Sequence, residues 1–242
     1  MHTIAEPDVP RRQFRSRFAA IAWGLSTASL ALFASGLTYA TAVEVHRLTR
    51  PLPARPPEVV RDVIVRNAAD ANGRYASFRI LLFSDEFRWR LSSYDALEST
   101  PTQPAFTREM RAVLDDAEEI ICVGASSEEI PTGVSQEKGR VEEEKRAARR
   151  AERIALWVRS ALSRPIPVRK LNVGHHAPTR HVGDTSDQRR VVIIVVLDRD
   201  DKTDIDQALR AAMAREKDRA PIFDTLLTKY SLAAGPAFTW VD

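Results

Sequence analysis

One uncharged stretch near the start of the chain constrains its fold most. Residues 18–43 contain no Asp, Glu, Lys or Arg, although the whole chain carries 36 Lys and Arg and 33 Asp and Glu. Crossing the hydrocarbon layer of a bilayer takes roughly 20 helical residues, and this run is long enough. Trp23 and Tyr39 lie near its two ends, where aromatic side chains favour the membrane interface. We therefore expect a single transmembrane helix over residues 18–43.

Two alternatives to a retained membrane anchor follow from the same stretch. Arg11 and Arg12 look like the core of a twin-arginine export signal, and residues 40–42 form a small-x-small cleavage pattern. The apolar region of a signal peptide spans only about 7–15 residues, so we favour the anchor. A buried helix is the third reading. The arginines before the run would hold residues 1–17 in the cytoplasm as a tail, but arginines also follow it, so the charge bias alone does not settle the orientation. In both the anchor and the signal reading, the rest of the chain is exported.

The overall composition is that of a folded protein and excludes several function classes. Hydrophobic residues make up 44% and charged residues 29%, which are globular values. The net charge of +3 is close to balance and no basic stripe is present, so we expect no nucleic-acid partner. Cys122 is the single cysteine, which rules out an intrachain disulfide. No catalytic triad or phosphate-binding glycine loop occurs, so we predict no enzyme and no cofactor.

The periodicity after the anchor predicts strands and helices in a mixed order. Prolines make residues 44–57 an extended linker, and the Asp-Ala-Asn-Gly turn at 70–73 predicts a hairpin. An unbroken apolar run at 191–197 predicts a central strand covered on both faces or nearly so. Strands are expected at 59–65, 75–83, 120–123, 168–173 and 191–197, and helices at 104–117, 142–162, 203–217 and 221–230.

This order predicts an α+β fold whose mixed sheet is covered by helices on one side. Residues 58–200 would form the domain, including an extra N-terminal hairpin, and residues 201–242 a helical C-terminal extension. Phe223 and Tyr230 in that extension need burial against the domain or a partner.

Four local strings carry a resemblance to a known family. Residues 120–124 (Ile-Ile-Cys-Val-Gly) look like the strand before a Gly-x-Thr-Asp turn, and residues 149–151 (Arg-Arg-Ala) like an Arg-Ala pair on the second helix. Residues 171–174 (Leu-Asn-Val-Gly) and 188–196 are similar to the last two strands. In this order they resemble the OmpA/MotB-like peptidoglycan-binding domain over residues 78–198. The resemblance implies a single-pass protein of the bacterial inner membrane with a periplasmic C-terminal domain.

The resemblance also implies a binding site for the peptidoglycan stem peptide. Its diaminopimelate group is a zwitterion, which needs an arginine fork for the carboxylate and an acid for the ammonium. Arg150 would be that arginine, and Ser127 stands where the family has its Asp. Glu128 or Glu129 would then be a displaced substitute. Arg190, beside the last strand, is expected to pair with a carboxylate such as Asp187, or else to be a surface charge.

This sequence departs from the family pattern in two further places. Glu143 replaces a neutral Asn at the start of the second helix, and the loop over residues 130–140 is longer than usual. Arg150 also has a plainer interpretation, as one solvated charge among the arginines of its helix. A loop cluster of histidines and aspartates could hold a metal, but a polar loop is the simpler reading and we predict none. That cluster comprises His175, His176, His181, Asp184 and Asp187.

Two functions therefore remain open. In the first, slightly favoured, a non-catalytic bitopic inner-membrane protein contacts peptidoglycan through a modified site. In the second, the degenerate domain is a structural or interaction subunit of a membrane protein complex, joined to a membrane partner through its transmembrane helix. Residues 18–43 lack the acid of an ion-driven, MotB-like motor. A homo-oligomer is compatible with both functions. The first function predicts that Glu128 or Glu129 lies within salt-bridge reach of a ligand held by Arg150. The second predicts that the loop over residues 130–140 fills the ligand pocket.

Overall fold

The computed structural model of the chain describes residues 59–83, 87–98, 106–129, 133–178, 185–233 and 235–242. The expected cytoplasmic tail, transmembrane helix and linker (residues 1–17, 18–43 and 44–57) lie outside these ranges. Among the helices that the described ranges contain, none is both long and apolar enough to cross a bilayer.

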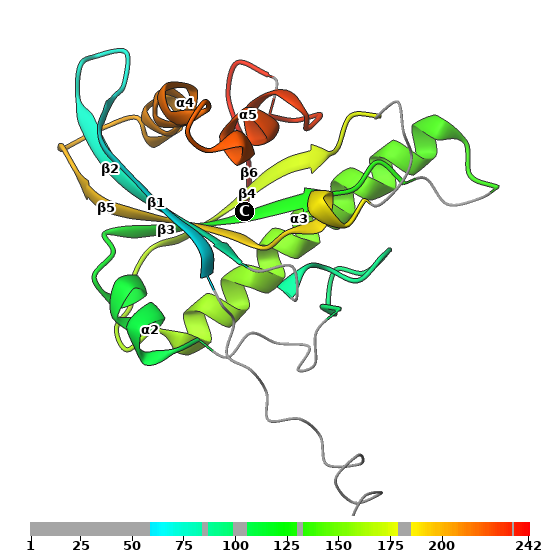
Figure 1. Cartoon of the computed structure of the whole chain (residues 1–242), viewed down its shortest axis with the longest axis horizontal. Helices are drawn as coiled ribbons and strands as arrows, with labels where there is room; N and C mark the ends of the chain where they lie inside the picture. The colour runs from blue at the N-terminus through cyan, green and yellow to red at the C-terminus, as the bar shows by residue number, and fades with distance from the viewer. Residues whose placement is uncertain (1–58, 84–86, 99–105, 130–132, 179–184, 234) are drawn as a thin grey trace, which may run out of the picture. The chain divides into compact units, whose positions relative to one another are not determined.

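Six strands form one mixed sheet in the order β1-β2-β5-β3-β4-β6, and helices pack on it (Figure 1). β3 and β4 run parallel, and the other neighbouring strands pair antiparallel. The α+β class with a mixed sheet is thus confirmed. The strands are β1 (Val59–Ala69), β2 (Tyr75–Phe83), β3 (Glu119–Ser126), β4 (Val168–His175), β5 (Val192–Arg199) and β6 (Thr239–Val241). The helices are α2 (Arg108–Asp115), α3 (Gln136–Ala161), the 3-10 turn η2 (Ser186–Arg189), α4 (Ile205–Glu216) and α5 (Pro221–Thr228).

Asp70 fixes the predicted turn between β1 and β2 and ties it to α4. Its carboxylate accepts the backbone N–H groups of Asn72 at 2.8 Å, Arg74 at 3.0 Å and Asp204 at 3.0 Å. Gly73 has a φ of 75°, which suits a residue without a Cβ. The Asp204 hydrogen bond, with the other two, holds the pKa of Asp70 below its usual value. The hairpin is therefore pinned to the start of α4.

Helices cover both faces of the sheet, so the expectation of cover on one side is wrong. α2 and α3 lie on one face, and α4 and α5 lie on the other (Figure 1). In β5, Ile194 and Val196 face the α4–α5 side, whereas Ile193 and Val195 face the α3 side. Every residue of β3 is buried as well. Strands that are apolar on both faces need a helical layer on each, which confirms the prediction made from residues 191–197.

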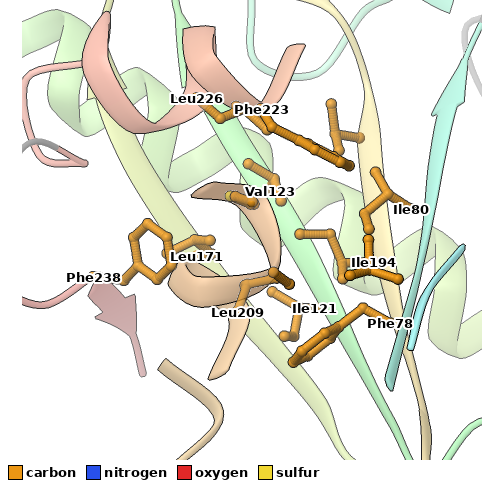
Figure 2. Close-up of a cluster of buried hydrophobic side chains, with 14 of the residues drawn as sticks. Phe78, Ile80, Ile121, Val123, Leu171, Ile194, Leu209, Phe223, Leu226 and Phe238 are labelled. Carbon is orange, nitrogen blue, oxygen red and sulfur yellow. The ribbon is translucent and has the colours of Figure 1, made fainter. Parts of the chain in front are cut away.

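Residues 201–242 complete the core rather than extend a finished domain. Leu209 and Phe223 pack against Ile121 and Ile194 of the central strands (Figure 2). The chain then returns to the sheet as β6, which pairs antiparallel with β4 and was not predicted. The burial needed by the apolar residues of this tail is thus met within the domain.

α3 begins earlier than the sequence predicted. Its N-cap is Ser135, whose hydroxyl accepts the N–H of Lys138 at 3.4 Å. The segment expected as a loop over residues 130–140 is therefore helical from Gln136 onward, and residues 130–132 lie outside the described ranges. The long helix carries its charged first half past the end of β3.

Candidate ligand-binding site

The site predicted around Arg150 is built where α3 crosses β3 at very short range. A Cβ at Gly124 would lie 1.9 Å from the carbonyl oxygen of Ala147 and 2.7 Å from the backbone N of Ala151. Only glycine allows this approach of helix and strand backbones. It places Arg150, on the same stretch of α3, beside the end of β3.

Arg150 is fully buried, and its guanidinium binds backbone carbonyls. Nη1 donates to the carbonyl oxygen of Ala125 at 2.7 Å, and Nε and Nη2 both donate to that of Ser93, at 2.9 and 2.7 Å. The guanidinium also lies over the Trp89 ring, 5.5 Å from its centroid. Burial, more than the nearby charge of Arg146, lowers the pKa of Arg150, although the group stays protonated at neutral pH. Its interpretation as a solvated charge is wrong.

The residue that faces Arg150 belongs to a small hairpin, residues 88–98, which we call the 88–98 hairpin. Its two arms pair through an isolated bridge between Trp89 and Leu97 and through the hydrogen bond from Glu98 N to Arg88 O at 2.9 Å. Ser93 lies in the connecting turn. The turn is exposed on its outer side, where Leu91 and Tyr94 reach solvent. The inner side of the turn presents the Ser93 carbonyl to α3.

Aromatic and ionic contacts hold the 88–98 hairpin in place. Trp89 is fully buried and stacks on Trp157 of α3, with ring centroids 5.3 Å apart. The backbone carbonyl of Arg189, in η2, accepts the N–H of Trp89 at 2.8 Å. The side chain of Arg189 donates through Nη1 to the Trp89 carbonyl at 2.6 Å and to the Glu98 carboxylate at 2.7 Å. Arg149, beside Arg150, lies over the Tyr94 ring at 4.9 Å. Two consecutive arginines thus contact the hairpin turn.

The other predicted site residues lie near the end of β3, and Glu128, Glu129 and Arg190 are engaged in contacts of their own. Ser127 is buried. Glu128 donates its N–H to the side chain of Gln188 at 2.9 Å and accepts from the Gln188 amide at 3.2 Å. Arg190 pairs with Asp187 at 2.6 Å, as predicted, and keeps part of its side chain in solvent. Glu129 accepts a hydrogen bond from Thr185.

Glu143, which replaces a neutral Asn of the family, is neutralised inside the fold. Its buried carboxylate accepts hydrogen bonds from the Ser126 hydroxyl and from Nη1 of Arg146. Burying a carboxylate is costly unless it is paired and hydrogen-bonded, and these two partners supply both. Arg146 and Ser126 therefore provide the hydrogen bonds and the charge that Glu143 needs in place of a neutral Asn. The sequence did not indicate that these residues are its partners.

The histidine and aspartate cluster that the sequence raised as a metal site lies only partly within the described residues. Within these residues, no three His, Cys, Asp or Glu side chains gather closely enough to hold a metal ion. Nδ1 of His175 lies 3.4 Å from Oε1 of Glu144. His181 and Asp184 fall outside the described ranges. Cys122 is buried, and burial raises the pKa of its thiol, which keeps it protonated. In this arrangement, the guanidinium of Arg150 binds the backbone carbonyls of Ser93 and Ala125.

Sequence reasoning missed the 88–98 hairpin as the partner of Arg150. A backbone carbonyl leaves no mark in a pattern of side chains. The available signal was the alternation of Phe87 and Trp89 with Arg88 and Arg90, which is typical of a strand with one buried face.

Comparisons of the chain with protein-family models, with curated proteins and with solved structures found no match. The resemblance drawn from the four sequence strings therefore stays a prediction.

Proposed function

We propose that this chain is a non-catalytic interaction subunit of a membrane protein complex. Its degenerate OmpA-like domain does not bind the peptidoglycan stem peptide through Arg150. The observation that carries this proposal is the state of Arg150. It is fully buried, and its Nε, Nη1 and Nη2 atoms already donate to the carbonyl oxygens of Ser93 and Ala125. The proposal relies on the sequence-based prediction of the anchor at residues 18–43 for its place in the membrane.

Binding of peptidoglycan through a modified site, the function that the sequence slightly favoured, is the alternative to this proposal. A ligand carboxylate could reach Arg150 only after the 88–98 hairpin left it. Hydrogen bonds to a charged group each contribute about 1.5–3 kcal/mol, and Arg150 donates two of its own to the Ser93 carbonyl. The stack of Trp89 on Trp157 would be disturbed as well. A wall peptide would have to offset all of this before it gained any net affinity.

Two measurements on the full chain separate these functions. The first is co-sedimentation of the purified protein with peptidoglycan sacculi, over a range of sacculus concentrations and with a diaminopimelate-containing peptide as competitor. The second is the mass of the particle that contains the chain after mild detergent extraction from membranes. We expect no saturable, peptide-competed binding to sacculi, and a particle that contains other polypeptides in a fixed ratio. Saturable binding that the peptide abolishes would contradict the proposal, and so would a particle made of this chain alone.

A further inference from the structure

An exposed strand edge is the strongest feature of the fold that the proposed function does not use. β1 is the first strand of the sheet, and within the described parts of the chain no strand pairs with its outer side (Figure 1). An open edge presents unpaired N–H and C=O groups to any strand of suitable sequence. The side chains of β1 determine which strand could pair with this edge.

The side chains of β1 differ sharply between its two faces. Val65 and Ala68 are buried in the core on the face that α4 covers. Asp62, Ile64 and Arg66 are exposed, and the exposed fraction of Ile64 is 45%. These three residues alternate along the strand, so they lie on the opposite face. An apolar residue between an acid and a base is thus presented at the edge.

The order Asp62, Ile64, Arg66 is complementary to itself when two copies run antiparallel. With a two-fold axis at Ile64, Ile64 of one copy faces Ile64 of the other, and Asp62 faces Arg66 twice. Residues opposite each other must share a face of the joined sheet, so only shifts that keep this alternation are allowed. The next allowed shifts place Asp62 opposite Ile64, or Ile64 opposite Arg66. The register centred on Ile64 is therefore the one that pairs both charges.

We propose that the β1 edge is a dimerisation surface, on which a second copy of this chain adds its own β1 antiparallel in the register centred on Ile64. Such a contact is isologous, since the same residues contribute from both copies. It joins the two sheets edge to edge by main-chain hydrogen bonds, as strand addition does in peptide recognition. This inference is independent of the function proposed for the Arg150 site.

Neighbouring contacts define the charge and the length of this edge. Arg79 of β2 already binds Asp62 through Nε, at 2.8 and 2.9 Å, and through Nη2. Across the interface Asp62 would therefore lie between Arg79 and the Arg66 of the other copy. From the Arg66 carbonyl onward the edge is closed, because Arg215 of α4 donates to the carbonyls of Arg66 and Asn67 and the strand bulges between Val65 and Ala68. The pairing is thus limited to residues 62–66.

Single-cysteine cross-linking of the full chain tests the register directly. In the proposed dimer the Cα atoms of the two Ile64 residues are about 4.5–5.5 Å apart, which suits a disulfide. The two Asp62 residues are offset by four positions, or about 13 Å along the strand. Under mild oxidation we expect Ile64→Cys to form a disulfide-linked dimer about tenfold faster than Asp62→Cys, because only facing positions are within reach. Combining Asp62→Cys with Arg66→Cys restores cross-linking. The native Cys122 is fully buried and does not compete.

A second pair of variants tests the assembly without new thiols. Ile64→Lys places two like charges face to face, and the matched control Leu156→Lys alters an exposed apolar residue of α3, whose exposed fraction is 55% against 45% for Ile64. By analytical ultracentrifugation we expect the unaltered chain and Leu156→Lys to be dimeric and Ile64→Lys to be monomeric. The proposal is overturned if the unaltered chain is monomeric, if Ile64→Lys stays dimeric, or if Ile64→Cys cross-links no faster than Asp62→Cys.

Discussion

Replacing Arg150 with alanine is expected to lower the free energy of unfolding by about 3–5 kcal/mol, because one buried and one half-buried carbonyl lose a charged donor and a cavity opens beside Trp89. The carbonyls are those of Ala125, at the end of β3, and of Ser93, in the 88–98 hairpin. The hairpin turn would then be held on α3 mainly by Arg149. The measurement is the urea concentration at half-unfolding, followed by tryptophan fluorescence, since Trp89 and Trp157 lie at the site.

Arg149→Ala is the matched control for Arg150→Ala. Arg149 is the adjacent arginine, but it is exposed and contacts the hairpin through the face of Tyr94. Its loss should cost only about 0.5–1 kcal/mol, the usual strength of an exposed cation–π contact. Arg150→Lys should fall between the two, because lysine keeps the charge but not the planar fork. Equal midpoints for Arg150→Ala and Arg149→Ala would show that Arg150 is not a structural residue.

Gly124→Ala is expected to cost about 3 kcal/mol or more, because overpacking against backbone cannot be relieved by turning a side chain. The new Cβ would lie 1.9 Å from the carbonyl oxygen of Ala147. Relief requires α3 to move away from β3, which would also break the bond between Arg150 and Ala125. We expect little folded protein by circular dichroism, or a much lower urea midpoint.

Gly235→Ala is the control for Gly124→Ala. The nearest atom to a Cβ at Gly235 is 3.6 Å away, an ordinary contact. Its effect should stay within about 0.5 kcal/mol, as for most surface substitutions. If Gly124→Ala folds as well as Gly235→Ala, α3 and β3 do not approach each other as described.

Local patterns in the sequence were enough to find most of the elements. The turn at 70–73 has residues whose side chains and φ angles suit only a turn, so β1 and β2 were placed on either side of it. The apolar run at 191–197 required cover on both faces, and β5 has it. Strong periodicity and specific turn residues act over a few positions, and for that reason they can be read without knowledge of the rest of the fold.

The errors arose where distant parts of the chain decide the outcome. The two helices after residue 200 were predicted, but not their place as a second layer on the other face of the sheet. β6 was not predicted, because a three-residue strand depends on the edge of β4 with which it pairs. Arg150 was weighed as a ligand residue or a solvated charge. Its actual partners are backbone carbonyls, one of them 57 residues away in sequence. No side-chain pattern encodes such a contact.

The Arg150 guanidinium, in the function proposed above, stabilises the fold and is closed to ligands. The most direct measurement is the ¹⁵N NMR signal of the Arg150 Nε–H in the arginine-labelled full chain, assigned by its disappearance in Arg150→Lys. We expect a signal that is protected from exchange with water and unchanged when a diaminopimelate-containing peptide is added. A rapidly exchanging signal, or one that shifts saturably with the peptide, would contradict the proposed function.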